Sequence, residues 1–220
     1  MELYEAMRCA PTTRRFTPAP VPPEVLARVL DSARYAPSGG NRQPWRVVAV
    51  REEAARRTLR DLYLPHWRAY LEHTGGAAML AEPAQFDPGR VRMIRRADEF
   101  AQAIDQVPLH LTIWADLASL AIVDSGLDRP SVVGGASIYP FVHNVLLGLR
   151  AEGLGAALTT LLAPAEPEVK RLLAVPDGLA LAAYLLVGTR ADPWPRRLSR
   201  RPVEEFAFAE RYGEALPQAD

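Results

Sequence analysis

The chain has 220 residues, of which 49% are hydrophobic and 24% charged, and its 26 basic and 26 acidic residues give a formal net charge of zero. This balance provides no bulk attraction to nucleic acid or to an anionic membrane surface, so we expect neither as a partner. There is no apolar run long enough for a membrane span, no apolar region of a secretory signal, and no partner for an internal disulfide to the lone Cys9, so we expect a cytoplasmic protein.

The first quarter of the chain predicts a helix, a loop and a strand, followed by a second helix. Apolar residues at helical spacing predict a helix over residues 25–33, and prolines on both sides fit its start and its end. The loop at 37–41 leads into a β-branched run at 47–50, which is typical of a strand. Leucines among many charged residues then predict a helix over 52–72.

Residues 73–105 mix glycines and prolines with a charged helical patch near 95–103. We expect a mobile or lid-like insertion here. A second strand is predicted at 107–115.

The strongest helix prediction covers residues 137–152, which are apolar around most of the circumference, so this helix should be buried. Ser137 is a suitable N-cap residue and Gly153 a suitable C-terminal cap. The remaining predicted elements are a strand, a short helix and a strand, at residues 156–162, 168–173 and 179–187.

The tail from residue 192 is rich in proline and arginine and cannot build a core alone. We expect it to lie across another surface, such as the body of a partner subunit. Several helices with few strands and no regular β-α alternation indicate an α+β domain.

Three segments have groups that suit an anion or a planar polar ring. The first, residues 12–16, combines two threonine hydroxyls with two guanidinium groups, which bind phosphate well. The second, residues 37–45, offers two glycines, the amides of Asn41 and Gln43, and the apolar anchor Trp45.

The third segment, residues 196–202, carries paired arginines that could complete a phosphate site. Each segment, taken alone, has an equally good explanation without a ligand. The first is then a solvated basic stretch, the second an ordinary helix–strand turn, and the third a solvated tail. The four histidines have no metal-ligand spacing, so no metal is expected, and His143 on the apolar helix is interpreted as a core histidine.

Together, these segments resemble the FMN-dependent nitroreductase family, in the order in which that family carries them. The resemblance spans most of residues 3–60 and 107–213. The stretches that carry it are residues 14–16, 36–45, 136–155 and 200–205.

The resemblance implies a single domain over residues 1–220, with the variable insertion at about 73–105 and a C-terminal arm at about 192–220. It implies an α+β fold, namely an α/β/α sandwich with a small mixed or antiparallel central sheet, in an intertwined homodimer. Two FMN molecules would lie at the dimer interface, each contacted by both subunits.

The resemblance also assigns the flavin contacts, in four groups. The ribityl-phosphate and pyrimidine side would be contacted by Thr12, Thr13, Arg14 and Arg15. The other subunit would contribute Pro37, Ser38, Gly39, Asn41 and Gln43. The isoalloxazine would be backed near N5 by Leu158, Thr159, Thr160 and Leu161. The phosphate clamp would be completed by Arg200 and Arg201.

One departure from the family concerns the two positions before Thr12, where arginines are frequent and this chain has Ala10 and Pro11. The implied reaction passes hydride from NAD(P)H through flavin N5 to a nitroaromatic, a quinone or a similar electron-poor small molecule. No catalytic side chain is assigned, because solvent can supply the proton. The alternatives are a flavin-dependent dehalogenase or dehydrogenase, a non-catalytic flavin-binding protein, and an arginine-tailed interaction domain.

Overall fold

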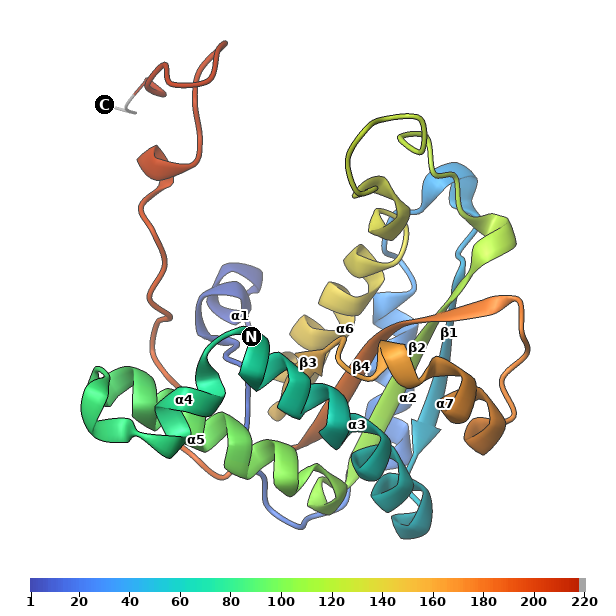
Figure 1. Ribbon diagram of the computed structural model, residues 1–220. Coiled ribbons are helices and arrows are strands. Elements are labelled where there is room, and N and C mark those ends of the chain that lie inside the picture. The colour runs from blue at the N-terminus through green and yellow to red at the C-terminus, as the bar shows by residue number, and fades with distance from the viewer. Residues whose placement is uncertain (218–220) are drawn as a thin grey trace.

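The computed structural model describes residues 1–217 and has three layers, with a four-stranded sheet between two sets of helices (Figure 1). The sheet order is β1-β2-β4-β3, and each neighbouring pair is antiparallel. The strands are β1 Trp45–Val50, β2 Leu109–Asp116, β3 Leu154–Thr159 and β4 Leu179–Thr189. The predicted α+β class with a small antiparallel sheet is therefore confirmed.

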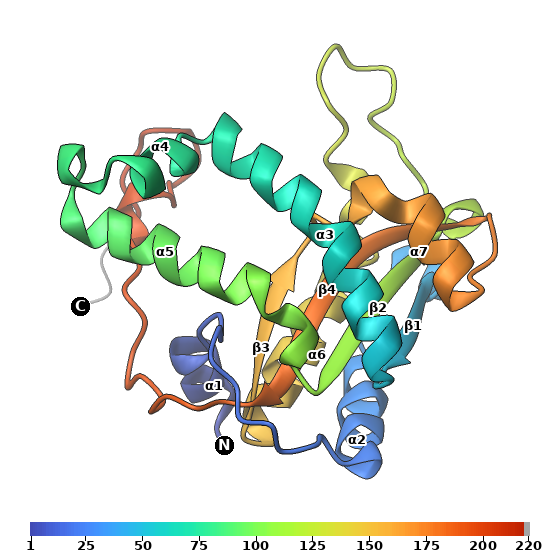
Figure 2. The ribbon, with the colours of Figure 1, turned by 60° about the horizontal axis from the view of Figure 1, so that its bottom comes forward.

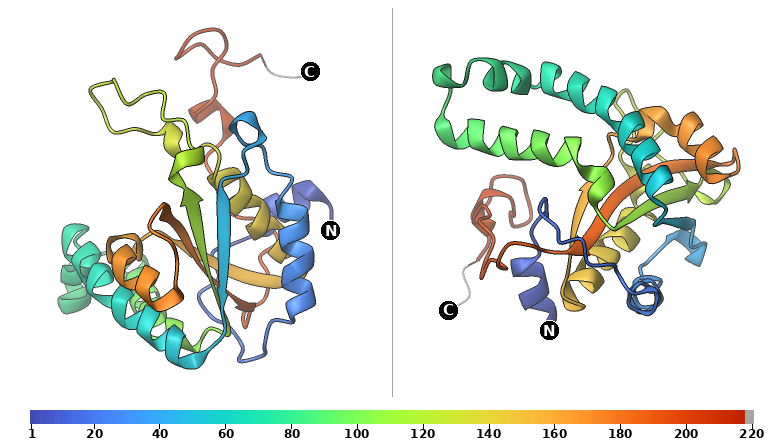
Figure 3. Two further views of the ribbon diagram at one scale, coloured as in Figure 1. Left: turned by 90° about the vertical axis from the view of Figure 1, so that its right-hand side faces the viewer. Right: turned by 90° about the horizontal axis from the view of Figure 1, so that it is seen from below.

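Seven α-helices lie in the described part of the chain. They are α1 Leu3–Cys9, α2 Pro23–Ala33, α3 Glu53–His73, α4 Gly76–Ala81, α5 Pro88–Gln102, α6 Tyr139–Ala151 and α7 Glu166–Leu173. Helices α2 and α6 cover one face of the sheet, and α3 and α7 cover the other, as the edge-on left view of Figure 3 shows. None of the helices in residues 1–217 is both long and apolar enough to cross a membrane.

Two apolar clusters hold these layers together, because successive strand residues point to opposite faces of the sheet. Leu109, Leu111 and Ile113 of β2 are fully buried against α2 and α6. On the other face, Trp114 and Tyr184 are fully buried with residues of α3. Burying each such side chain contributes roughly 1.5–3 kcal/mol to folding, so both faces of the sheet are fixed by packing.

His110 of β2 is the core histidine, and the expectation for His143 was wrong. His110 is fully buried, with Nε2 2.8 Å from the carbonyl oxygen of Ile104 and Nδ1 2.6 Å from the Tyr184 hydroxyl. Because a carbonyl only accepts, Nε2 carries the proton and Nδ1 accepts from Tyr184. His143 is exposed on α6, because only one face of this helix, with Val142, Val145 and Leu149, packs into the core.

The predicted helices and strands are confirmed, with shifted ends in the second half of the chain. Helix α6 begins at Tyr139, and Ser137 does not cap it, because the Ser137 hydroxyl instead accepts from the Gly39 amide at 3.0 Å. Gly153 does end the helix, with φ of 79° and its amide donating to the Arg150 carbonyl at 3.1 Å. Strand β3 runs over 154–159, earlier than predicted, because residues 160–162 turn toward α7.

The insertion at 73–105 is a helical hairpin that continues from α3 through α4 into α5. Figure 2 shows α5 running beside α3, with both helices extending past the edge of the sheet. The Trp67 indole of α3 donates to the Asp98 carboxylate of α5 at 2.8 Å, and Met79 and Val91 are buried between the helices. The hairpin therefore has a core of its own.

The C-terminal arm leaves the sheet after β4, and beyond residue 200 it runs away from the body of the subunit (Figure 1). Several of its large apolar side chains are exposed, among them Phe206 at 64% and Tyr212 at 93%. Positions 218–220 of the predicted arm lie outside the described residues.

Candidate functional site

The N-terminal segment 12–17 extends the sheet beyond β3 and β4. The Thr13 amide donates to the Ala156 carbonyl at 2.8 Å, and the Thr17 amide donates to the Thr189 carbonyl at 2.9 Å. Since side chains alternate along an extended segment, Thr13 points into the protein and is fully buried, while Thr12 and Arg14 point outward and are exposed. The segment therefore presents a hydroxyl and a guanidinium group on one side.

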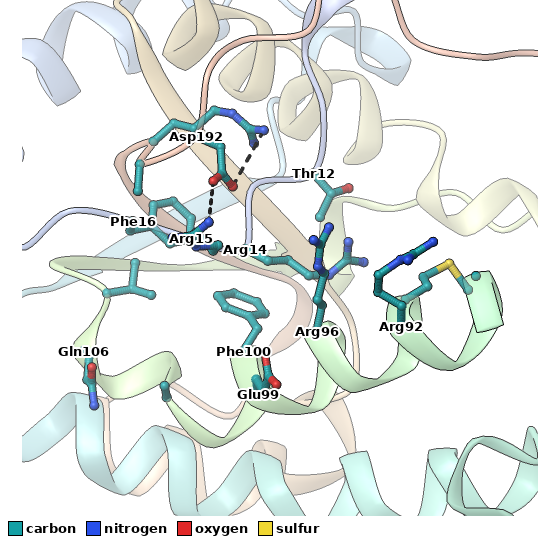
Figure 4. Close-up of a pocket in the computed structure, with 16 residues that line it drawn as sticks. Thr12, Arg14, Arg15, Phe16, Arg92, Arg96, Glu99, Phe100, Gln106 and Asp192 are labelled. Carbon is teal, nitrogen blue, oxygen red and sulfur yellow. Dashed lines mark hydrogen bonds and ion pairs between the residues drawn. The ribbon is translucent and has the colours of Figure 1, made fainter. Parts of the chain in front are cut away.

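This outward side lines a cavity of about 780 Å³, which is within the size range of small-molecule sites. Its opposite wall is α5, and the segment after β4 closes one end (Figure 4). The polar side chains around it are Thr12, Arg14, Arg15, Arg92, Arg96, Glu99, Gln106, Arg190 and Asp192.

Positive charge dominates this cavity. Arg15 is paired with Asp192 at 2.7 Å, and Arg190 lies 4.0 Å from the same carboxylate. Among residues 1–217, no carboxylate lies within ion-pair distance of Arg14, Arg92 or Arg96. Figure 4 shows Arg14 and Arg96 pointing toward one another from opposite walls below Thr12. Like charges without a counter-ion favour the binding of an anion.

The arginines of α5 were not predicted as site residues. Arg92 and Arg96 are four residues apart, so they lie on the same face of α5. This spacing is the feature of the sequence that could have identified them as a pair. The spacing alone did not assign them to the site, because the sequence does not show that α5 lies opposite residues 12–16.

A second, smaller cavity of about 210 Å³ adjoins the first, and Thr12 lines both. Ala10, Pro11 and the edge strand β3 form its walls, with Arg150 of α6 and Trp194 of the C-terminal arm. Leu158 of β3 also lines it and is 42% exposed, which is unusual for a large apolar side chain on an otherwise buried sheet.

The residues that follow Leu158 lie at the end of β3. Thr159 is half-buried and its hydroxyl accepts from the Leu161 amide at 3.2 Å, while Thr160 is exposed. Beside them, burial raises the pKa of Tyr63, and its hydrogen bond with Thr159 opposes that shift. Leu158 and Thr12 both line the smaller cavity, so the segments 158–161 and 12–15 lie next to each other at the edge of β3.

The loop before β1 has an unusual backbone. Asn41 and Gln43 have φ of 53° and 48°, in the left-handed region that non-glycine residues rarely adopt. The Ser38 hydroxyl accepts from the Gln43 amide at 3.0 Å, and the Gln43 side chain donates to the Asn41 side chain at 3.2 Å. Such over-determined conformations are frequent at functional sites.

This loop does not meet the N-terminal segment within one subunit. It leads into β1, and segment 12–17 lies on β3, at the other edge of the sheet. Pro37, Gly39, Asn41 and Gln43 are exposed there and Ser38 is half-buried.

Arg200 and Arg201 are also separate from the other predicted residues. Both are exposed on the arm, where Arg200 donates to the Ser199 carbonyl at 2.7 Å and Arg201 lies 3.9 Å from Glu205. One subunit therefore brings together two of the four predicted groups, those of residues 12–15 and 158–161.

The groups around the two cavities fit a planar, phosphorylated ligand. Unpaired guanidinium groups match a phosphate or an electron-rich ring edge, and the exposed Leu158 offers an apolar surface to a ring face. No cluster of three histidine, cysteine or acidic side chains that could hold a metal occurs in residues 1–217.

Comparison with known proteins gives a consistent assignment. The model of the nitroreductase family matches residues 11–189. The 5,6-dimethylbenzimidazole synthase of Rhodospirillum rubrum is 30% identical over 197 residues, which cover 88% of this chain and 81% of that protein.

Two solved structures show the same fold. An iodotyrosine deiodinase bound to FMN and 3-iodo-L-tyrosine has a TM-score of 0.67 and 26% identity, with 92% of this chain and 96% of that chain covered. An FMN- and NADPH-dependent nitroreductase from Sphigopyxis sp. strain HMH has a TM-score of 0.69 and 20% identity, with 96% and 100% covered.

Proposed function

The chain belongs to the nitroreductase family, and from this premise we propose that it is a homodimeric oxidoreductase that binds FMN and reduces an electron-poor small molecule at the expense of NAD(P)H. The observation that carries this proposal is the cavity between segment 12–16 and α5. Arg14 and Arg96 face each other there, and neither has a carboxylate partner within residues 1–217.

Bound FMN would supply the redox chemistry, which is the transfer of a hydride from NAD(P)H to the acceptor. The chain's own residues bind and orient. Arg14 would stabilise negative charge on the pyrimidine side of the ring, because its guanidinium lines the cavity and carries a permanent positive charge. Leu158 would pack against the ring face, and Thr12 would donate its hydroxyl proton toward the ribityl-phosphate side.

The helical hairpin α4–α5 would form one wall of the acceptor pocket and limit the access of water to it. The hydrogen bond between Trp67 of α3 and Asp98 of α5 ties the hairpin to α3, so it is a stable wall. No side chain needs to act as a nucleophile or as the proton donor, since a water molecule can supply the proton.

A second subunit would complete the site. The loop of Asn41 and Gln43 and the arm of Arg200 lie apart from Arg14 in one subunit, and each could reach the flavin of a partner. The exposed Phe206 and Tyr212 of the arm favour this arrangement, because large apolar side chains on an extended segment gain most from a partner surface.

The relatives catalyse different reactions, so the acceptor is a separate question from the cofactor. One relative is a dimethylbenzimidazole synthase and one structural neighbour is an iodotyrosine deiodinase. The second candidate function is therefore reductive dehalogenation by the same bound flavin.

The experiment has two stages. The visible spectrum of the purified protein and the identity of the released chromophore establish whether FMN is bound. NAD(P)H oxidation is then followed with a nitroaromatic, a quinone and a halophenol as acceptors, and we expect ping-pong kinetics with the first two. A colourless protein that does not take up FMN would reject the proposal. Turnover of the halophenol alone would favour the dehalogenase.

A further inference from the structure

Arg150, near the C-terminal end of α6, carries a buried charge whose counter-ion is missing from the described chain. Only 9% of its surface is exposed, and its Nε atom has no hydrogen-bond partner. None of the ion pairs within residues 1–217 includes it. Because burying an unpaired guanidinium costs several kcal/mol, such a group is retained where an anion or a strong acceptor meets it.

Two features reduce that cost without removing it. The Cζ atom of Arg150 lies 3.9 Å from the centre of the Trp194 ring, in a cation–π contact. Arg150 also lies in the last turn of α6, where the helix dipole favours positive charge. Neither feature gives the Arg150 guanidinium a counter-ion within residues 1–217.

The arrangement also fixes the direction of the guanidinium fork. Trp194 covers one face of the guanidinium plane, and a second guanidinium, that of Arg190, lies 5.6 Å from the same ring. The Arg190 side chain is itself held by the Pro193 carbonyl at 3.2 Å and by the Thr13 hydroxyl at 3.4 Å. Trp194 thus lies against two guanidinium groups, and it covers one face of the Arg150 guanidinium.

The space beside Arg150 is the smaller cavity, of about 210 Å³. Of the side chains that line it, Arg150 is the only charged one and Thr12 carries the only hydroxyl. Since a water molecule occupies about 30 Å³ of liquid, this cavity has room for a phosphate group. Thr12 lines both this cavity and the larger one, so the two lie next to each other.

On the premise that the chain binds FMN, we propose that Arg150 and Trp194 form the phosphate end of the flavin site. The phosphate accepts hydrogen bonds from the Arg150 fork and from the Thr12 hydroxyl, with Trp194 holding the fork in plane. The phosphate is therefore bound from α6, while Ala10 and Pro11 provide only the shape of the wall. Arg200, which is exposed on the arm, has a secondary role.

The test compares FMN with riboflavin, which has the same ring system and ribityl chain but no phosphate. Full-length protein freed of flavin is titrated with each, and binding is followed by the quenching of flavin fluorescence. The wild-type protein should prefer FMN, and Arg150→Gln should reduce this preference roughly tenfold to a hundredfold, because charge-assisted hydrogen bonds are lost. Its affinity for riboflavin should stay within about twofold of the wild-type value.

The matched control is Arg28→Gln. Arg28 lies on neighbouring α2 and pairs with Glu152 at 2.7 Å, just beyond the end of α6, but lines neither cavity. Arg150→Lys should keep part of the preference, since it retains the charge but loses the fork. Trp194→Leu leaves the charge in place and should lower the preference at least threefold, which tests the site if Arg150→Gln does not fold.

The outcomes separate the two proposals. A wild-type protein that binds neither flavin rejects the proposed function, and the phosphate site with it. In the other case, the wild-type protein binds FMN, but Arg150→Gln and Trp194→Leu keep the full preference for FMN over riboflavin. That result overturns the phosphate site and leaves the proposed function standing.

Discussion

A Cβ atom on Gly155 would lie 2.5 Å from Oγ1 of Thr13, closer than two such atoms can approach. The contact arises where the N-terminal segment crosses β3, next to the hydrogen bond from the Thr13 amide to the Ala156 carbonyl. The backbone on either side of this crossing carries Thr12 and Arg14, so glycine at 155 fixes how closely the candidate site approaches the sheet.

Gly155→Ala should therefore weaken flavin binding. The added methyl group pushes Thr13 outward and displaces Thr12 and Arg14 from the cavity, with a stability cost of about 1–3 kcal/mol, as for overpacking of a core. Flavin content per subunit and the thermal midpoint measure the two effects. Gly178→Ala is the control, because a Cβ atom there meets nothing within 4 Å. Equal flavin retention by both variants would show that the close crossing is not required.

Arg14→Ala should lower the affinity for FMN by roughly tenfold, since it removes a guanidinium group that lines the cavity and has no carboxylate partner within residues 1–217. A solvated arginine on α3 serves as the control, and the structure makes Arg57 suitable, because it is half-exposed and pairs only with Glu53 on the same helix. Arg56 looks equally solvated in the sequence, but it donates to the Val107 carbonyl at 2.5 Å and is partly buried. Equal loss of flavin from Arg14→Ala and Arg57→Ala would reject the role of Arg14.

The stability of the protein should fall as the pH is lowered from 7 to 5, because of His110. Burial lowers the pKa of His110 from 6.5 to about 3, so the unfolded chain binds a proton in this range and the native protein does not. Protonation of the unfolded state through this one group should lower the free energy of unfolding by about 2 kcal/mol between pH 7 and pH 5.

Urea unfolding at the two pH values measures this change. His110→Gln can keep the donor to Ile104 and the acceptor for Tyr184, but it does not titrate, so it should be less sensitive to pH than the wild-type protein. His143→Gln, at an exposed position, should behave like the wild-type protein. The pH-stability link through His110 is wrong if all three proteins lose the same free energy.

These residues also show what the sequence could and could not predict. Periodicity located α2, β1 and β4 because their apolar faces repeat at helical or strand spacing. It could not tell which histidine is buried, because His110 and His143 are both surrounded by apolar residues, and only the assembled layers place one inside and one outside. Arg14 could be identified in the sequence because hydroxyl and guanidinium groups cluster around it. Arg150 has no such neighbours in the sequence, and its contact with Trp194, 44 residues later in the chain, appears only in the folded structure.

The C-terminal arm should be needed for dimer formation, and two truncations separate this role from that of Trp194. A chain that ends after Pro195 keeps the contact between Arg150 and Trp194 but loses Arg200, Phe206 and Tyr212. A chain that ends after Asp192 loses the contact as well. Removing exposed apolar side chains that would bury themselves on a partner should weaken the dimer in both cases, and light scattering after size exclusion measures its mass.

Flavin binding should then differ between the two truncations. The longer chain should still prefer FMN over riboflavin, because the anion-binding edge of Arg150 is intact, although a site that lacks the partner's groups binds both flavins more weakly. The shorter chain should lose most of the preference, because without Trp194 the Arg150 fork can rotate into solvent. If both truncated chains remain dimers with full flavin content, the arm lies across no partner, and the loop of Asn41 and Gln43 alone has to complete the site.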